Sequence, residues 1–144
     1  DKLYISAAAM PPAYLYSAET QSVDEIEIRN LPLGGLDNEQ FELVEKSFNK
    51  GDILVLLSDG LPEAPDLEGN LLDYQPVMDC IEKVAHLGAA QVKQALIDLA
   101  DDWLDGTQNP DDITFVVFEK QPNKKRKAQK ELEEEKNFNK VAQA

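Results

Sequence analysis

Two segments of this chain consist almost entirely of large apolar residues, residues 53–57 and residues 113–118. Strands whose hydrophobicity is continuous rather than alternating are typically covered on both faces. We therefore predict that both segments are central strands of one sheet. Because central strands tend to be neighbours, we also predict that the two strands pair in antiparallel fashion.

Shorter segments have the character of half-buried strands. In residues 25–28, Ile26 and Ile28 alternate with charged residues, as on a strand with one solvated face. Similar strand-like segments lie at residues 3–7, 14–17 and 41–48. A polar loop that contains Gly51 separates residues 41–48 from the first apolar run, and this order favours a hairpin between the two.

The apolar pattern changes to a helical period between Tyr74 and Gly106. Apolar residues recur there at three- and four-residue steps, in two groups: Val77, Ile81, Val84 and Ala85, then Val92, Leu96, Leu99 and Trp103. Gly88 follows the first group in the place of a C-terminal cap, and Gly106 follows the second. We therefore predict an α+β fold in which mostly antiparallel strands are layered against a helical pair that precedes the last strand.

The composition divides the chain into a body and a tail. With 144 residues, 42% of them hydrophobic, the chain is long enough for one domain with a core. We assign residues 1–119 to this domain and residues 120–144, which are rich in Lys and Glu, to a charged helical or disordered tail. Because the chain opens within strand-like residues, we expect an incomplete domain. A homodimer formed through the tail is a further hypothesis.

Charge is distributed unevenly between these two parts. Residues 1–119 contain 6 Lys or Arg and 24 Asp or Glu, a net charge of −18, whereas residues 120–144 contain 8 and 4, a net charge of +4. So acidic a body repels phosphate backbones and anionic lipid, and it attracts cations. We therefore expect no binding to nucleic acid.

Two further features concern the cellular setting. No apolar run approaches the length needed to cross a bilayer, so we expect no membrane insertion. Cys80 is the single cysteine, which makes an intrachain disulfide impossible and fits a reducing compartment. A cytoplasmic location is the expectation.

Acidic residues lie at one end of each apolar run. Asp59 follows the first run and Asp111 precedes the second. If the two strands pair antiparallel, both carboxylates reach the same edge of the sheet, where they repel each other and no basic residue is near in sequence. A hard divalent cation such as Mg²⁺ or Mn²⁺, which prefers oxygen ligands, would relieve that repulsion, and Asp112 could support it.

The same residues also have a purely structural explanation. Asp followed by Gly, as in Asp59-Gly60, is common in turns, and Asn-Pro-Asp-Asp before a strand is ordinary turn chemistry as well. The pattern alone leaves both interpretations open.

Longer motifs carry a resemblance to a known family. The segments GDILVLLSDGLPEAPDLEGNLLDY and DWLDGTQNPDDITFVVFE, with ISAAAMPPAYLY and LPLGGLD upstream, resemble the C-terminal part of bacterial serine/threonine protein phosphatases of the SpoIIE and RsbU type, within the PP2C class. The resemblance spans about residues 3–119. It implies a PP2C-like sandwich of antiparallel sheets flanked by helices, with metal ions at one end.

The resemblance also implies a chemistry and a set of residues. In this family a water bound to Mn²⁺ or Mg²⁺ attacks phosphorus directly, and the substrate is phosphoserine or phosphothreonine on a regulatory protein such as an anti-sigma-factor antagonist. Asp59 and Asp111 match its metal ligands, and therefore its catalytic residues, whereas Gly60 and Asp112 match supporting positions.

The chain departs from the family pattern in three ways. Nothing in residues 1–58 matches the Asp and the adjacent Gly carbonyl that complete the family's metal site. Met10 stands where many relatives have His, and Asp73 stands where Gly is usual. The first departure motivates an alternative function: a non-catalytic interaction module of a phosphorylation switch.

Overall fold

The computed structural model describes residues 1–122, so the predicted tail at residues 120–144 lies almost wholly outside the described residues. The element order is β1 (Lys2–Ile5), β2 (Ala13–Ser17), β3 (Ser22–Ile26), β4 (Val44–Ser47), β5 (Ile53–Leu57), α1 (Tyr74–Val84), a 3₁₀ turn (Ala85–Leu87), α2 (Ala89–Leu104) and β6 (Phe115–Glu119). No helix within residues 1–122 is long and apolar enough to span a bilayer. The predicted α+β arrangement, with a helical pair before the last strand, is confirmed.

The strands form two antiparallel sheets. One has four strands in the order β3-β2-β5-β6, and the other consists of β1 and β4. β5 pairs antiparallel with β6 over its whole length, with Ile53 opposite Glu119 and Leu57 opposite Phe115. The prediction that the two apolar runs are antiparallel neighbours is therefore confirmed.

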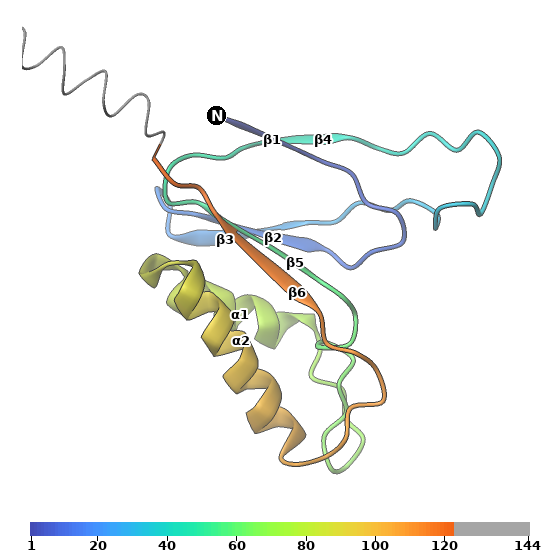
Figure 1. The fold of residues 1–144 in the computed structure, drawn as a ribbon, viewed down its shortest axis with the longest axis vertical. Coiled ribbons are helices and arrows are strands. Elements are labelled where there is room, and N and C mark those ends of the chain that lie inside the picture. Colours follow the sequence, from blue (N-terminus) through green and yellow to red (C-terminus); the bar gives the residue numbers. More distant parts are fainter. Residues whose placement is uncertain (123–144) are drawn as a thin grey trace, which may run out of the picture.

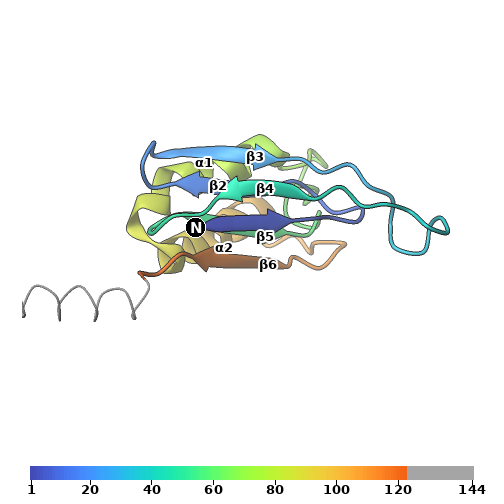
Figure 2. The ribbon, with the colours of Figure 1, turned by 90° about the horizontal axis from the view of Figure 1, so that it is seen from above.

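These elements form three layers (Figure 1). The two helices cover one face of the four-stranded sheet, and β1 with β4 covers the other. Seen from above, β1 and β4 lie over the middle of that sheet, with β3 and β6 toward its two sides (Figure 2). β5 therefore lies between two apolar layers.

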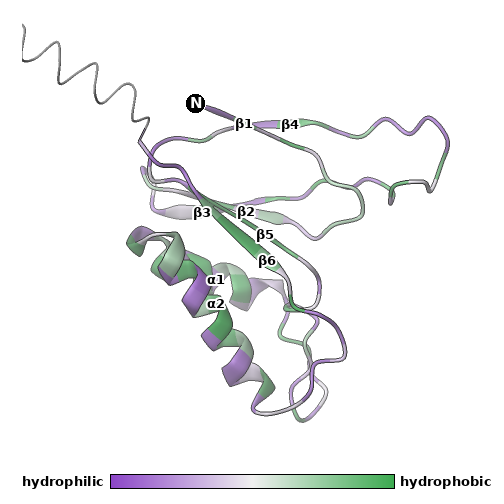
Figure 3. Cartoon of the chain, in the orientation of Figure 1, coloured by the Kyte–Doolittle hydropathy of each residue, from purple (hydrophilic) through white to green (hydrophobic). Residues whose placement is uncertain are grey.

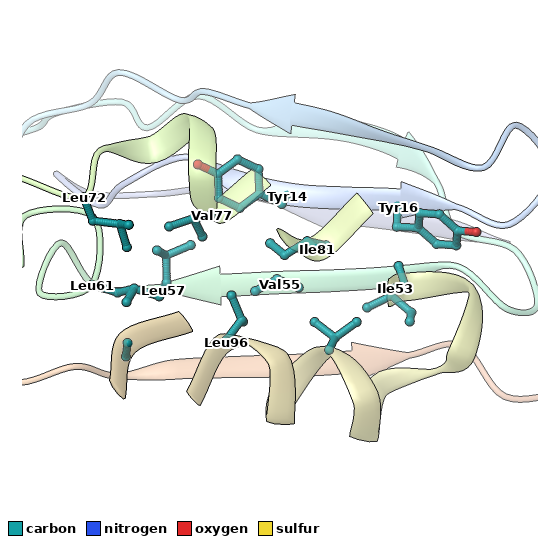
Figure 4. Close-up of a cluster of buried hydrophobic side chains, with 13 residues drawn as sticks. Tyr14, Tyr16, Ile53, Val55, Leu57, Leu61, Leu72, Val77, Ile81 and Leu96 are labelled. Atoms are coloured by element: carbon teal, nitrogen blue, oxygen red, sulfur yellow. The ribbon is translucent and has the colours of Figure 1, made fainter. Parts of the chain in front are cut away.

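The main core lies between the four-stranded sheet and the helices. Figure 4 shows side chains from β2, β5 and both helices meeting there, among them Ile53, Val55, Ile81 and Leu96, which are almost fully buried. A second cluster on the opposite face packs Leu15 and other residues of the sheet against the β1–β4 layer. Each fully buried aliphatic side chain of this kind contributes about 1.5–3 kcal/mol to stability.

The predicted hairpin between residues 41–48 and β5 is wrong. β4 pairs with β1, and the chain then crosses to the other sheet, where β5 lies between β2 and β6. Burial explains the difference: β4 alternates between half-buried and exposed residues and can cover only one face, whereas β5 is apolar throughout and needs both faces covered. Gly51, with φ of +88°, and the buried Asp52 make the crossing.

The prediction that residues 113–118 form a central strand is also wrong, because β6 is an edge strand. Phe115 and Val117 face the helices, but Val116 and Phe118 lie on the opposite face and are 46% and 48% exposed. The hydrophobic colour of β6 is visible in Figure 3. The β1–β4 layer does not extend far enough to cover these two side chains.

The start of α1 is strained. Its first residue is preceded by Asp73, which has φ of 71° and ψ of 166°, a region that is essentially restricted to glycine. The Asp73 carboxylate accepts a hydrogen bond from the Tyr74 backbone N–H, and the Asp73 N–H donates to the Pro62 carbonyl. This backbone conformation gives a physical reason why glycine suits the position.

We predict that Asp73→Gly raises the free energy of unfolding by about 1 kcal/mol, because glycine relieves the backbone strain. Loss of the capping carboxylate costs only a few tenths of a kcal/mol when glycine replaces aspartate, so the relief of strain outweighs it. Asp73→Ala is the control: it keeps the strain and loses the cap, and should lower stability by about 1 kcal/mol. Urea denaturation of the three proteins measures both changes. A glycine variant less stable than the wild type would contradict the explanation.

Candidate metal centre

The segment after β5 and the segment before β6 lie side by side. The Ser58 backbone N–H donates to the Thr114 carbonyl at 2.8 Å, which extends the β5–β6 ladder beyond the strands. The Ser58 hydroxyl accepts from the Thr114 N–H at 3.1 Å and donates to the Asp112 carbonyl at 3.2 Å. Ser58 thus joins the two segments through both its backbone and its side chain.

Gly60 makes the next contact between the two segments. A Cβ atom added to Gly60 would lie 2.3 Å from the Asp112 carbonyl oxygen, so the two backbones are in direct contact. The Asn109 side-chain amide donates to the Gly60 carbonyl at 2.9 Å. The structure therefore brings Gly60 and Asp112 together, each next in sequence to a predicted metal ligand, Asp59 or Asp111.

The predicted ligands themselves are solvent-exposed. Asp59, Asp111 and Asp112 all lie on the surface, and the Asp111 carboxylate accepts a hydrogen bond from the Asp112 N–H at 2.7 Å. Within residues 1–122, no group of three or more Asp, Glu, His or Cys side chains is placed to hold a metal ion. The assignment of Asp59 and Asp111 as ligands stays a prediction.

The turn that carries Asp59 is held from several sides. The Glu63 N–H donates to the Asp59 carbonyl at 2.9 Å, which closes the turn. Further along, the Ala64 carbonyl accepts from the Trp103 indole N–H at 2.9 Å and from the Leu72 N–H at 3.0 Å. Trp103 belongs to α2, so the helical layer fixes the segment that follows Asp59.

The surroundings of this turn are acidic. The pKa of Tyr74 is raised, first by burial of the phenol and then by the negative charges of Glu63, Asp59 and Asp73. The ion pairs formed among residues 1–122 involve none of these carboxylates, nor Asp111. Such oxygen-rich, uncompensated charge suits a hard divalent cation. Two carboxylates are nevertheless fewer oxygen ligands than Mg²⁺ takes, so the described residues fit part of a metal site.

Sequence reasoning missed three residues that hold the two segments together: Ser58, Trp103 and Asn109. A local pattern gives little warning of them, because their partners lie 39–56 residues away in sequence. The one available signal was an amide side chain, Asn109, two residues before Asp111.

Asp52, at the opposite end of β5 from Asp59, has a structural role. Its buried carboxylate accepts hydrogen bonds from the backbone N–H groups of Ala18 and Asn49, at 2.9 and 2.6 Å. It stabilises the crossing between the sheets, in keeping with the turn chemistry of this segment.

The fold is similar to part of the PP2C phosphatase domains of known structure. The PP2C domain of SiaA from Pseudomonas aeruginosa has a TM-score of 0.69 and 18% identity, over 83% of this chain and 46% of that chain. The RsbU and RsbW domains of Rv1364c from Mycobacterium tuberculosis give 0.65 and 24%, over 83% and 32%. The PP2C domain of SpoIIE from Bacillus subtilis, with a fragment of its regulatory domain, gives 0.62 and 21%, over 85% and 35%. These similarities establish the fold.

The model of the family named Stage II sporulation protein E (SpoIIE) matches residues 1–121. The chain therefore belongs to the SpoIIE family, and the resemblance seen in its sequence is confirmed. No curated protein matches the chain. The chain spans less than half the length of each of the three solved structures named above.

We predict that Gly60→Ala lowers the free energy of unfolding by at least about 2 kcal/mol, because the new methyl group would overlap the Asp112 carbonyl. Gly35→Ala is the control, since its added Cβ would lie 3.1 Å from the nearest atom, the Pro32 carbonyl, in an exposed loop. Its cost should stay below about 1 kcal/mol. Chemical denaturation compares them, and equal costs would argue against a tight contact at Gly60.

Proposed function

We propose that this chain forms part of a metal-dependent phosphatase that hydrolyses phosphoserine or phosphothreonine on a regulatory protein. The observation that carries the proposal is the direct backbone contact of Gly60 with Asp112, which brings the segments of Asp59 and Asp111 to one end of the four-stranded sheet. Membership of the SpoIIE family supports the same conclusion. A SpoIIE phosphatase domain of Bacillus subtilis, with a TM-score of 0.53 and 17% identity, is described as presoaked with Mn.

In this proposal Asp59 and Asp111 would supply carboxylate oxygens to Mn²⁺ or Mg²⁺, and Gly60 and Asp112 would support them. The bound cation would supply activation of water and neutralisation of charge on the phosphoryl group. The residues of this chain contribute position: the Ser58 hydroxyl and the Gly60 backbone fix the distance between the two ligand-bearing segments. Fixed ligands lower the cost of organising the site for each turnover.

The proposed partner is a phosphorylated regulatory protein such as an anti-sigma-factor antagonist, and the proposed location is the cytoplasm. The acidic surface would repel a free phosphate group, so recognition of the substrate depends on the cation and on contacts with the protein that carries the phosphate. The same net charge argues against nucleic acid as a ligand.

The test is phosphate release from a phosphoserine peptide by the full-length protein, with and without Mn²⁺. We predict that Asp59→Asn and Asp111→Asn each lower Mn²⁺-dependent kcat/KM by about 100-fold or more, as expected when a ligand that orients the metal is removed. Asp98→Asn is the matched control, because Asp98 lies on the exposed side of α2 and bonds only to Gln94 among the described residues.

Turnover that survives both substitutions would refute the assignment of the site. The alternative, a non-catalytic interaction module, makes a different prediction: the full-length protein would bind the phosphorylated partner without releasing phosphate, and Mn²⁺ would not change that binding. A phosphate-release assay combined with a pull-down of the partner separates the two functions.

A further inference from the structure

We infer that Asn109 is a positioning residue of the metal centre, whose side-chain amide locks the Asp59-Gly60 turn against the loop that carries Asp111. This inference rests on the proposed function. Asn109 would not touch the cation or the substrate; it would act through the backbone of Gly60.

The hydrogen bond of Asn109 is well placed for this role. Its Nδ2 donates to the Gly60 carbonyl at 2.9 Å and so connects residues 49 apart in sequence. On the far side of the same turn, Ser58 bonds to Asp112 and Thr114. The turn is therefore held on both sides of Asp59, by Ser58 before it and by Asn109 after it.

The link from Asn109 to the second predicted ligand is short and stiff. Pro110 alone separates Asn109 from Asp111. The proline ring fixes its own φ and restricts the residue before it to extended conformations. A shift of Asn109 would therefore move the backbone of Asp111 as well, because the segment between them has little conformational freedom.

The carbonyl oxygen of the Asn109 side chain indicates that the residue has a role beyond packing. Its Oδ1 is buried and has no hydrogen-bond partner among the described residues, as is also true of Thr107 Oγ1. An unpaired buried amide oxygen is unfavourable, and an apolar side chain of the same shape would avoid it. The bond from Nδ2 to Gly60 is the interaction that such an apolar side chain could not replace.

Positioning matters here because the predicted ligands are exposed and lie on separate loops. Nothing in residues 1–122 pairs Asp59 directly with a basic side chain, so the backbone must set the distance between the two carboxylates. Residues that orient metal ligands typically change metal affinity by 10–100-fold when they are replaced. The expected size of the effect follows from that range.

The experiment measures binding of Mn²⁺ alone to the full-length protein, by electron paramagnetic resonance of the free ion, together with the Tm. Asn109→Leu keeps the shape, removes the donor and removes the unpaired oxygen. We expect its Kd for Mn²⁺ to rise about 10-fold. Its Tm should change little, because removal of the unpaired Oδ1 offsets loss of the donor to the buried Gly60 carbonyl. Asn109→Ala should raise the Kd by a similar factor.

The matched control is Asn30→Ala. Asn30 is also partly buried and also donates through Nδ2 to a carbonyl, that of Ala7, at 2.9 Å, but it connects loops that do not include Asp59 or Asp111. Its Kd for Mn²⁺ should stay within twofold of the wild-type value even if its Tm falls.

Each other outcome would overturn the inference. An unchanged Kd in Asn109→Leu would show that the bond does not position the ligands. An equal rise in Kd for Asn30→Ala would indicate general loosening of the fold, and unfolding of both Asn109 variants would assign the residue to stability alone. If the wild type and Asp59→Asn both fail to bind Mn²⁺, the failure lies with the proposed metal centre itself.

Discussion

The pairing of β5 with β2 and β6 at the centre of the four-stranded sheet determines where the candidate site lies. β5 is apolar along its whole length, so it is stable only where both of its faces and both of its edges are covered. The helices cover Ile53 and Val55 from one side, and the β1–β4 layer covers Leu54 from the other. Because β6 pairs with β5 in a fixed register, the loop before β6 must lie beside the turn after β5. The candidate metal centre is a consequence of that register.

The same strand shows what a sequence pattern can and cannot establish. The bounds of β5, the two helices and the antiparallel pairing of the apolar runs follow from local hydrophobicity, because burial imposes a period on each element. The hairpin was mispredicted because turn chemistry is local, whereas the partner of β4 was decided by how much burial each strand requires. β6 was mispredicted as a central strand because its sequence is apolar. The sequence does not indicate whether the β1–β4 layer reaches Val116 and Phe118, and these two side chains are exposed.

Some residues of the candidate site could be identified from the sequence, and others could be identified only from the structure. Asp59 and Asp111 could be selected from the sequence because each is adjacent to an apolar run, and strand polarity places both at one edge. The steric fit of Gly60 against Asp112 and the bonds of Ser58 and Asn109 could not be selected, because they depend on loops that meet only in three dimensions. A carboxylate at the end of a strand can be recognised from one short segment of sequence. The groups that hold it in place come from several segments that are far apart in the sequence.

Electrostatics connects this geometry to the proposed reaction. Asp59, Glu63 and Asp73 place negative charge around one tyrosine, Tyr74, on a body whose net charge is −18. A phosphate group that approaches such a surface is repelled unless a cation is already present. If the proposed reaction is correct, binding of the cation and binding of the phosphoprotein would therefore favour each other. Such coupling acts equally in both directions. The groups that hold the two acidic segments together are all neutral: the Ser58 hydroxyl, the Gly60 backbone and the Asn109 amide. They would leave this proposed dependence intact, whereas a lysine or arginine among the carboxylates would neutralise part of their charge and weaken it.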